Sequence, residues 1–450
     1  MSRLFGTDGV RGIANSELTP ELAFNLGKAG AHVLNKEKRK PVVLIGRDTR
    51  ISGDMLESAL CAGILAVGGN VIKVGILPTP AVAYLVRYFD ADAGVMISAS
   101  HNPFEYNGIK FFNEKGFKLD DDIEDAIEDI IVRDIDVNSH ITGDRLGKCI
   151  EGEEDALELY AAFLKSTIDR DLKGIKIVLD CANGAAYKVA EKVYKDLGAD
   201  VTVIGNRPNG LNINEGCGST HPGQLQKKVI EEKALMGLAF DGDADRLIAV
   251  DEKGNIIDGD RQICICAKMM KEEGTLKDNK VTATVMSNIG FHKYMEDLGC
   301  AVNTTKVGDR YVLEEMVKTG CVIGGEQSGH IIFLDHTTTG DGILSSLQLI
   351  KAVKDSGLEP SELFGEVAIY PQVLRNAKVR NENKNKYEKD PDIVKEIERL
   401  QKEMDGEGRI LIRPSGTEPL VRVMIEGRNE GYITDLAEDL AELITRKLGQ

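Results

Sequence analysis

Short apolar runs that end in polar loops recur along most of the chain. Runs of this kind occur in PVVLIGRDTR, GVMISASHN, GIKIVLDCANG, LMGLAFDGD and KVTATVMSN. Helix-like stretches such as AEKVYKDLG lie between them. Strands that alternate with helices indicate mixed or parallel sheets with helices on their faces. The pattern therefore predicts an α/β protein.

One junction between a helix and a strand occurs three times. VGGNVIKVG (67–75) and LGADVTVIG (197–205) align without gaps, and LGCAVNTTKVG (298–308) repeats the pattern with two extra residues. A glycine that closes a helix just before an apolar strand is typical of such a junction. Three copies spread along the chain predict three related α/β domains.

The last part of the chain has a different pattern. A charge-rich stretch (381–392) is followed by a helix, the strands RILIRP and LVRVMIEG, and a closing helix. In the second strand Val421, Val423 and Ile425 alternate with less apolar neighbours, which is typical of a sheet with one covered face. This part is predicted to be a separate α+β domain.

A chain of 450 residues is too long for a single core. The expected fold has three related mixed-sheet α/β domains plus a C-terminal α+β domain around a central cleft. The predicted boundaries are residues 1–152 with a serine loop, 153–252 with an acidic loop, 253–367 with a glycine-rich loop, and 368–450 with a phosphate-binding loop.

Charge and cysteine usage exclude several classes of protein. The net charge of −17 argues against nucleic-acid and anionic-membrane partners. No stretch approaches the roughly 20 apolar residues of a membrane span, and the N-terminus lacks the apolar core of a signal peptide. The eight cysteines form no C-x-x-C pair, which indicates reduced thiols. A cytoplasmic protein is predicted, in which local Arg and Lys attract any anionic substrate.

The loop DGDADR (241–246) places three carboxylates at alternate positions, Asp241, Asp243 and Asp245. Such a cluster repels itself unless a cation binds, and hard oxygen ligands select Mg²⁺ or Ca²⁺. The spacing also matches an EF-hand as far as Glu252, but Arg246 stands where that loop needs glycine. A solvated acidic turn is the third alternative. The prediction is a catalytic metal site.

A serine loop follows another buried strand. In ISASHNP, Ser100 is followed by His101, and Lys110 lies shortly afterwards. Ser and Asn before Pro also form plain turns, and no G-x-S-x-G elbow supports acyl transfer. A hydroxyl that carries a phosphoryl group beside a metal fits better, because phosphoryl transfer needs positioning and charge neutralisation. The phosphoserine would then add a ligand to the metal.

Two further loops carry groups suited to a sugar phosphate, although each is also compatible with a plain turn. GGEQSGHI (324–331) presents side chains suited to sugar hydroxyls, and its predicted substrate-binding residues are Gly325, Glu326, Gln327 and Ser328. RPSGTEP (413–419) offers a guanidinium, two hydroxyls and backbone N–H groups to one phosphate, with Arg422 on the next strand, and its predicted phosphate-binding residues are Arg413, Ser415, Gly416, Thr417 and Arg422.

Arginines near polar turns are candidates to stabilise the predicted active site. Arg11 lies in FGTDGVRG, Arg47 and Arg50 lie in GRDTRISG, and Arg310 lies in VGDR at the end of an apolar run. The two loops with Arg11, Arg47 and Arg50 are also compatible with structural turns that contain Asp–Arg pairs.

Taken in order and spacing, ISASHNP, DGDADR, GEQSGH and RPSGTEP resemble the α-D-phosphohexomutase family over the whole chain. The resemblance implies four domains around a cleft and an intramolecular phosphotransferase, an isomerase. It implies that Ser100 is phosphorylated and that Asp241, Asp243 and Asp245 bind one Mg²⁺ per chain. It also implies that Arg11, Lys110 and Arg246 lie near the transferred group, with Lys110 and His101 as candidates for proton handling.

The opening FGTDGVRG, Gln327 and the stretch FLDHTTTGDGILSSLQLI resemble the branch of the family that acts on glucosamine phosphates. This implies conversion of glucosamine 6-phosphate to glucosamine 1-phosphate for UDP-N-acetylglucosamine synthesis, with a sugar 1,6-bisphosphate as intermediate and activator. Relatives are often dimers, so a homodimer is compatible with the resemblance. The alternatives are a mutase for glucose or mannose phosphates, a phosphoserine phosphatase, and a non-catalytic sugar-phosphate binder.

Overall fold

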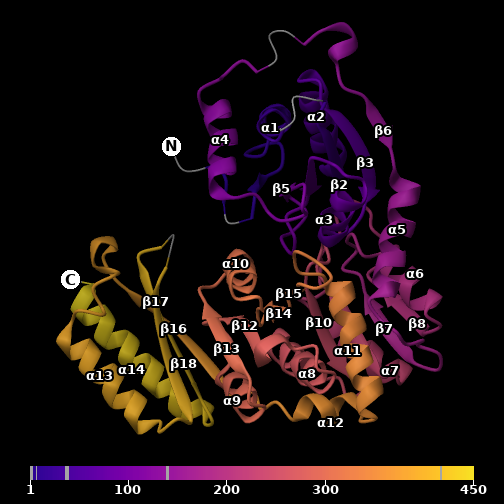
Figure 1. The fold of residues 1–450 in the computed structure, drawn as a ribbon. Coiled ribbons are helices and arrows are strands. Elements are labelled where there is room, and N and C mark those ends of the chain that lie inside the picture. The colour runs from indigo at the N-terminus through magenta and orange to yellow at the C-terminus, as the bar shows by residue number, and fades with distance from the viewer. Residues whose placement is uncertain (1–3, 7, 36–39, 138–140, 416–417, 450) are drawn as a thin grey trace. The chain divides into compact units, whose positions relative to one another are not determined.

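The computed structural model describes residues 4–6, 8–35, 40–137, 141–415 and 418–449 (Figure 1). The chain forms two compact units. The larger unit comprises Met1–Met286 and Gly299–Glu366. The smaller unit comprises Ser287–Leu298 and Val367–Gln450. The segment Ser287–Leu298 therefore belongs with the C-terminal part of the chain, although it lies inside the predicted range 253–367.

The first sheet of the larger unit has six strands in the order β1-β5-β4-β2-β3-β6. β5 is antiparallel to both of its neighbours, and the other pairs are parallel. The strands are β1 (Val10–Ile13), β2 (Val42–Arg47), β3 (Asn70–Ile76), β4 (Ala93–Ile97), β5 (Tyr106–Asn113) and β6 (Cys149–Glu151). The helices are α1 (Pro20–Val33), α2 (Gly53–Ala66), α3 (Thr79–Tyr88) and α4 (Asp121–Val132), with a 3₁₀ turn at Gly143–Arg145.

Helices cover both faces of this sheet, and the residues of its central strands show why. Ile45 of β2 and Val95 of β4 are buried in a core that also includes residues of α1 and α2. Successive side chains of a strand point to opposite faces, so the neighbouring Gly46 faces the other side. A Cβ at Gly46 would lie 2.6 Å from Val82 of α3. The glycine therefore lets α3 approach the sheet closely.

The larger unit contains two further mixed sheets. The second has the order β11-β10-β9-β7-β8 and the third has the order β13-β12-β14-β15. The second comprises β7 (Lys176–Asp180), β8 (Asp200–Ile204), β9 (Met236–Phe240), β10 (Leu247–Asp251) and β11 (Ile256–Ile257), with α5 (Glu153–Ser166), α6 (Val189–Asp196) and α7 (Gly223–Glu232). The third comprises β12 (Lys280–Thr284), β13 (Ala301–Thr305), β14 (Ile323–Gly325) and β15 (Ile331–Phe333), with α8 (Gly259–Glu272), a 3₁₀ turn (Lys277–Asn279), α10 (Asp309–Thr319), α11 (Gly342–Ser356) and α12 (Pro360–Gly365).

The three repeated junctions have the same backbone conformation. Gly68, Gly198 and Gly299 have φ values of +85°, +91° and +67°. Each follows a helix and precedes a strand, β3, β8 and β13 respectively. This left-handed conformation suits glycine because it has no Cβ. The predicted α/β class with three related mixed-sheet domains is confirmed.

The smaller unit is an α+β structure built on an antiparallel sheet of order β16-β18-β17. Its elements are β16 (Gln372–Lys378), β17 (Gly408–Pro414), β18 (Leu420–Gly427), α9 (Ile289–Asp297), α13 (Pro391–Glu403) and α14 (Glu430–Leu448), with a 3₁₀ turn at Asn381–Asn383. Figure 1 shows α13 and α14 together against the sheet. Val421, Val423 and Ile425 belong to the core of this unit, so the predicted C-terminal α+β domain is confirmed.

The expectation of one bare face on this sheet is wrong at the end of β18. Glu426, which alternates with the core residues, is completely buried. It accepts hydrogen bonds from the backbone N–H of Ile289 at 3.1 Å and from Nε of Arg409 at 3.0 Å. The start of α9 therefore covers this part of the second face, because a buried carboxylate needs such donors.

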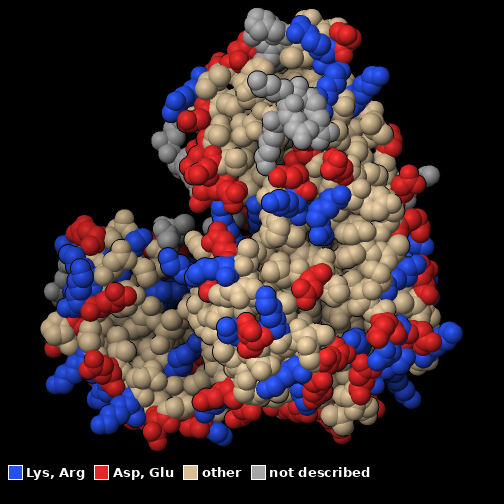
Figure 2. Space-filling view, viewed as in Figure 1, with Lys and Arg blue, Asp and Glu red and all other residues tan. Residues whose placement is uncertain are grey.

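Acidic and basic side chains share the surface. Figure 2 shows Lys and Arg interspersed with Asp and Glu on the face that it presents, in a chain with a net charge of −17. An anionic ligand must therefore be attracted by local clusters of positive charge. Within the part of the chain that the structure describes, no helix has the length and apolar character needed to cross a membrane.

Candidate active site

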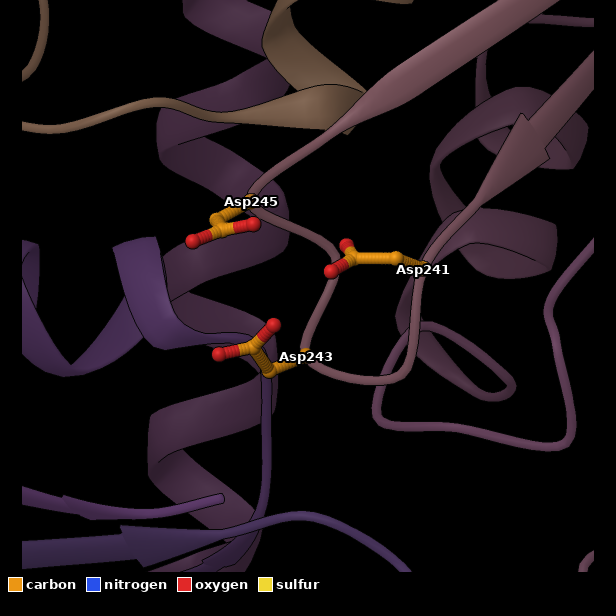
Figure 3. A group of neighbouring side chains, drawn as sticks. All are labelled: Asp241, Asp243 and Asp245. Carbon is orange, nitrogen blue, oxygen red and sulfur yellow. The ribbon is translucent and has the colours of Figure 1, made fainter. Parts of the chain in front are cut away.

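The acidic loop joins two antiparallel strands, β9 and β10. β9 is completely buried, so it delivers Asp241, the first residue after it, into the interior. Figure 3 shows Asp241, Asp243 and Asp245 of this loop pointing toward one another. The flanking strands exclude an EF-hand, whose loop lies between helices. Glu252, the twelfth position of that alternative, instead accepts a hydrogen bond from the backbone N–H of Ser361 at 2.9 Å.

The three carboxylates form a site that suits a divalent cation. Ligand oxygens of the three residues all lie within 4.8 Å of one another, and all three side chains are buried. Burial raises the pKa of Asp241 well above its ordinary value, and the charges of Asp245 and Asp243 raise it further. Oδ1 of Asp243 and Oδ1 of Asp245 are buried and make no hydrogen bond with the described residues. Unsatisfied, mutually repelling oxygen ligands of this kind fit Mg²⁺.

Ser100 lies directly beside this cluster. Its Oγ donates a hydrogen bond to Oδ2 of Asp241 at 2.6 Å and lies 3.3 Å from Nδ1 of His101. Ser100 has a φ of +54°, a left-handed conformation that is uncommon for residues other than glycine. Burial, assisted by Arg246 and Arg11, lowers the pKa of His101. The structure thus brings a hydroxyl, an imidazole and the acidic cluster together.

Lys110 reaches the same cluster from β5. Its Nζ lies 2.8 Å from Oδ2 of Asp243 and 3.0 Å from Oδ2 of Asp8. Burial acts to lower the pKa of Lys110, but the carboxylates of Asp243 and Asp8 raise it above its ordinary value. Lys110 is therefore a fixed positive charge in this arrangement, which favours electrostatic stabilisation over proton handling.

A cavity of about 460 Å³ opens beside the cluster, within the larger unit. Four of the predicted site residues line it: Arg11, Asp245, Arg246 and Glu326. The main-chain N–H of Arg246 donates to Oδ1 of Asp241 at 3.2 Å. The two arginines can bind an anionic group, and the carboxylates of the lining can accept hydrogen bonds from hydroxyls of the same ligand.

Two acidic residues of this cavity were missed by reasoning from the sequence. Asp8 and Asp309 line the cavity, and both contact Nζ of Lys118. Burial acts to raise the pKa of Asp8, but Lys110, Lys118 and Arg11 hold it well below its ordinary value. The loops FGTDGVRG and VGDR were selected from the sequence for their arginines. The aspartate in each of these loops was a signal that could have identified Asp8 and Asp309.

His330 was also left out of the predicted site. Its Nε2 accepts a hydrogen bond from the backbone N–H of Gly340 at 3.1 Å, and its Nδ1 lies 3.5 Å from Oδ2 of Asp245. Burial acts to raise the pKa of Asp245, but the contact with His330 and the charge of Lys110 lower it. The motif GEQSGH contains this histidine, which was the signal that could have found it.

The glycine-rich loop presents its residues in different directions. Oε1 of Glu326 accepts a hydrogen bond from the backbone N–H of Gly308 at 3.0 Å. Nε2 of Gln327 donates to Oδ2 of Asp258 at 3.3 Å, and Ser328 is exposed. Gly325 ends β14, where a Cβ would lie 2.4 Å from the carbonyl oxygen of His330. Of these four, only Glu326 lines the cavity beside the acidic cluster among the residues that the structure describes.

Arg310 is held away from this cavity. Its Nη1 lies 2.7 Å from Oδ1 of Asp121 on α4, and its Nε lies 3.2 Å from Oε1 of Glu314 on α10. It lines a different cavity of about 410 Å³ together with Phe117 and Leu313. The structure therefore places Arg310 in a contact between α4 and α10 and not beside Ser100.

The predicted phosphate-binding residues lie in the smaller unit. Arg413 of β17 and Arg422 of β18 are directly opposite each other, and burial together with Arg422 lowers the pKa of Arg413. Like charges in this position destabilise a sheet, so an anion bound between them is favoured. The carbonyl oxygen of the nearby Ser415 accepts from Nζ of Lys384 at 3.0 Å. Gly416 and Thr417 lie outside the described residues.

Family models match almost the whole chain. The four models describe domains of phosphoglucomutase/phosphomannomutase. Alpha/beta/alpha domain I matches residues 2–137, domain II matches 158–254, domain III matches 258–370, and the C-terminal domain matches 374–443. The order of the four matches agrees with the order of the predicted domains, whose boundaries remain a prediction.

Individual relatives and solved structures resemble the chain over its full length. A phosphoglucosamine mutase from Thermoanaerobacter sp. (strain X514) is 61% identical over 448 residues, which cover 100% of both chains. A crystal structure of a phosphoglucomutase/phosphomannomutase family protein from Burkholderia thailandensis matches with a TM-score of 0.82 and 24% identity, covering 99% of this chain and 98% of that one. An N-acetylphosphoglucosamine mutase from Aspergillus fumigatus, crystallised with GlcNAc-6P and magnesium, matches with a TM-score of 0.70 and 19% identity, covering 99% and 96%.

Proposed function

The chain belongs to the phosphoglucomutase/phosphomannomutase family, and we propose that it is a phosphoglucosamine mutase, an isomerase that interconverts glucosamine 6-phosphate and glucosamine 1-phosphate. The observation that carries the reaction is the 2.6 Å hydrogen bond from Oγ of Ser100 to Asp241. It sets a phosphoryl-accepting hydroxyl against a cation site. The preference for glucosamine is supported by the names of full-length relatives that are 56–61% identical to the chain.

In the proposed reaction, Ser100 carries the phosphoryl group between two hydroxyls of the sugar. The bond from phosphorus to Oγ of Ser100 breaks as the 1- or 6-hydroxyl oxygen of the substrate bonds to phosphorus. The product of this half-reaction is a sugar 1,6-bisphosphate, which then returns its other phosphoryl group to Ser100. The same bisphosphate acts as the activator that first loads the serine. His101 stands next to Oγ and is placed to exchange the proton.

The charges around Ser100 support phosphoryl transfer. Asp241, Asp243 and Asp245 would hold one Mg²⁺, which when bound supplies neutralisation of the negative charge on the phosphoryl oxygens. Lys110 and the cavity-lining arginines, Arg11 and Arg246, add fixed positive charge around the transferred group.

Substrate binding is assigned to the two remaining loops. We propose that Glu326, with Gly325, Gln327 and Ser328 of the same loop, contacts the sugar hydroxyls. Arg413, Arg422 and Ser415 bind the phosphate that is not being transferred, and Gly416 and Thr417 of the same loop complete that assignment. Arg310 was predicted to bind substrate as well, but its ion pairs with Asp121 and Glu314 favour a structural role.

A comparison of three sugar phosphates tests the assignment. With Mg²⁺ and a catalytic amount of bisphosphate, we expect glucosamine 6-phosphate to react with a kcat/KM about 10- to 100-fold above those of glucose 6-phosphate and mannose 6-phosphate. Sugar 1-phosphate is measured with a coupled assay and inorganic phosphate in parallel. Preferred turnover of another sugar would shift the assignment within the family, and release of phosphate without isomerisation would indicate a phosphatase.

The opposed arginines of the smaller unit give a second test. Arg413→Gln removes charge-assisted hydrogen bonds to the substrate phosphate, so we expect KM to rise about 10- to 100-fold with a smaller change in kcat. The melting temperature should not fall, because the repulsion from Arg422 is also removed. Arg375→Gln is the matched control, since Arg375 lies in the same sheet and pairs with Glu438 at 2.8 Å. An unchanged KM for Arg413→Gln would contradict the phosphate assignment.

We also propose a cytoplasmic location. All eight cysteines are free thiols, and all except Cys149 are buried, as is typical of proteins in a reducing compartment. A homodimer remains a prediction.

A further inference from the structure

The buried guanidinium of Arg50 donates hydrogen bonds to the backbone of the Ser100 loop. Nη2 of Arg50 donates hydrogen bonds to the carbonyl oxygens of Ser100 at 2.8 Å and Asn102 at 2.9 Å. Nη1 of Arg50 donates to the carbonyl oxygen of Pro103 at 2.6 Å. Arg50 is completely buried, so it has no contact with solvent to lose or gain. Three carbonyl groups of the loop therefore accept hydrogen bonds from one guanidinium.

Asp48 ties Arg50 to the other side of the same loop. Oδ2 of Asp48 accepts from Nε of Arg50 at 2.9 Å and from Oγ of Ser98 at 2.6 Å. The oxygen of that Ser98 hydroxyl accepts in turn from the backbone N–H of Ser100 at 3.0 Å. The N–H and the C=O of Ser100 are therefore both connected to one buried ion pair.

A second donor reaches the loop from the long connection between β8 and α7. Nδ2 of Asn214 donates to the carbonyl oxygens of Ser100 at 3.0 Å and Asn102 at 3.1 Å. The Asn214 side chain is buried, with a relative exposure of 7% for the residue. Gly242 of the acidic loop also packs against the Ser100 carbonyl group, since a Cβ at Gly242 would lie 2.5 Å from that carbonyl oxygen. The Ser100 carbonyl thus accepts two hydrogen bonds, one from its own domain and one from the next.

These contacts explain how Ser100 keeps its left-handed conformation. A φ of +54° brings Cβ of an L-residue close to its own backbone and is unfavourable. Relaxation to negative φ would have to reorient the N–H or the C=O of Ser100, and both are held by hydrogen bonds. The unfavourable conformation persists because the surroundings over-determine it. Its consequence is that Oγ faces Asp241.

We propose that Arg50, Asp48 and Asn214 are positioning residues for the reaction at Ser100. They act through the loop backbone and hold Oγ against the acidic cluster, whether or not the serine carries a phosphoryl group. Arg50 was one of the arginines that the sequence marked as a possible brace, whereas Asn214 carries no sequence signal. The inference rests on the proposed function for its catalytic part, and its structural part is independent of that function.

The chain offers a matched pair of variants in one loop. Asn214→Ala removes the two hydrogen bonds to the serine loop. Asn212→Ala also removes two side-chain hydrogen bonds, with the carbonyl oxygen of Arg207 at 3.1 Å and the N–H of Asn209 at 2.9 Å, and neither reaches Ser100. Neither variant leaves a buried charge unpaired, so both are expected to fold. Alanine at position 214 must also adopt a φ of +60°, which asparagine tolerates better, and the melting temperature of each variant measures that difference. Mass spectrometry then follows backbone hydrogen exchange in the peptide 97–104, alongside kcat and KM for glucosamine 6-phosphate.

For Asn214→Ala we expect exchange in this peptide to accelerate about 10-fold or more, kcat to fall about 10- to 100-fold, and KM to stay within about twofold of wild type. Asn212→Ala should match wild type in all three quantities. Wild-type exchange in Asn214→Ala, or faster exchange without loss of kcat, would overturn the proposal. If wild-type protein takes up no phosphoryl group on Ser100, the mutase assignment fails, and the exchange data still decide whether the contacts hold the loop.

Discussion

Ser100→Ala is expected to abolish isomerisation while leaving the fold intact. The side chain supplies the Oγ that accepts the phosphoryl group, and its immediate neighbour His101 has no hydroxyl to replace it. Turnover of glucosamine 6-phosphate should fall by about 10⁴-fold or more, equivalent to about 5.4 kcal/mol of barrier. The measurement pairs the coupled assay with transfer of labelled phosphoryl from a sugar 1,6-bisphosphate, followed by peptide mapping of residue 100.

A second buried serine controls for the loss of a hydroxyl as such. Ser345 on α11 is buried, and its Oγ has no hydrogen-bond partner among the described residues. Ser345→Ala should retain turnover and take up label on Ser100. Residual turnover near wild type in Ser100→Ala, or label on a different residue of wild-type protein, would remove Ser100 as the phosphoryl carrier.

The serine and the acidic cluster could be predicted because their signals are local. Asp241, Asp243 and Asp245 follow an apolar strand at alternate positions, and Ser100 follows another. In a layered α/β fold, the residues just after buried strands converge at one edge of each sheet. The structure adds the 2.6 Å contact between Ser100 and Asp241, which are 141 positions apart. No local pattern encodes that pairing.

The remainder of the cavity could not be predicted because it depends on strand register and domain packing. In FGTDGVRG both Asp8 and Arg11 line the cavity, whereas in VGDR Asp309 lines it and its neighbour Arg310 instead pairs with Asp121 of α4. Adjacent residues of one loop point in different directions, and the sequence does not state which of them faces inward. A contact 189 positions away determines where Arg310 lies.

Part of the smaller unit was hidden for a similar reason. The predicted last domain begins at residue 368 and the C-terminal part of the unit begins at Val367, but the unit also includes Ser287–Leu298. One contact that links this segment to the sheet is made by the buried carboxylate of Glu426, which accepts from the N–H of Ile289 at 3.1 Å. An acid that alternates with apolar residues predicts a solvent-facing position, so the sequence pattern pointed away from the actual arrangement.

The second large effect is expected at the acidic cluster, where Asp241→Asn should change stability and activity in opposite directions. Without metal, the variant removes one of three mutually repelling carboxylates, whose crowding raises the pKa of Asp241. The Asn side-chain oxygen can still accept from the N–H of Arg246 while its amide donates to Oγ of Ser100, so both contacts are retained. The melting temperature of the metal-free variant should therefore rise by about 1–2 °C, the response to about 1 kcal/mol in a chain of 450 residues.

With Mg²⁺ present, wild-type protein should instead have a higher melting temperature than Asp241→Asn. Binding at a concentration about 100 times Kd stabilises wild-type protein by about 2.7 kcal/mol, whereas the variant has lost a charged ligand and should gain little. Turnover of the variant should fall about 10³-fold. Calorimetry with and without EDTA measures the shifts, and the coupled assay measures turnover.

Asp180→Asn is the matched control for the metal response. Asp180 is buried at the end of β7 in the same sheet as β9, and burial raises its pKa as well. Its carboxylate accepts from the backbone N–H groups of Ala182 at 3.0 Å and Gly218 at 2.8 Å and lies outside the triad. This control should melt at a lower temperature but keep the full Mg²⁺ shift. A full Mg²⁺ shift in Asp241→Asn, or no shift in wild-type protein, would show that the three aspartates do not hold the cation, and the electrostatic basis of the proposed transfer at Ser100 would be lost.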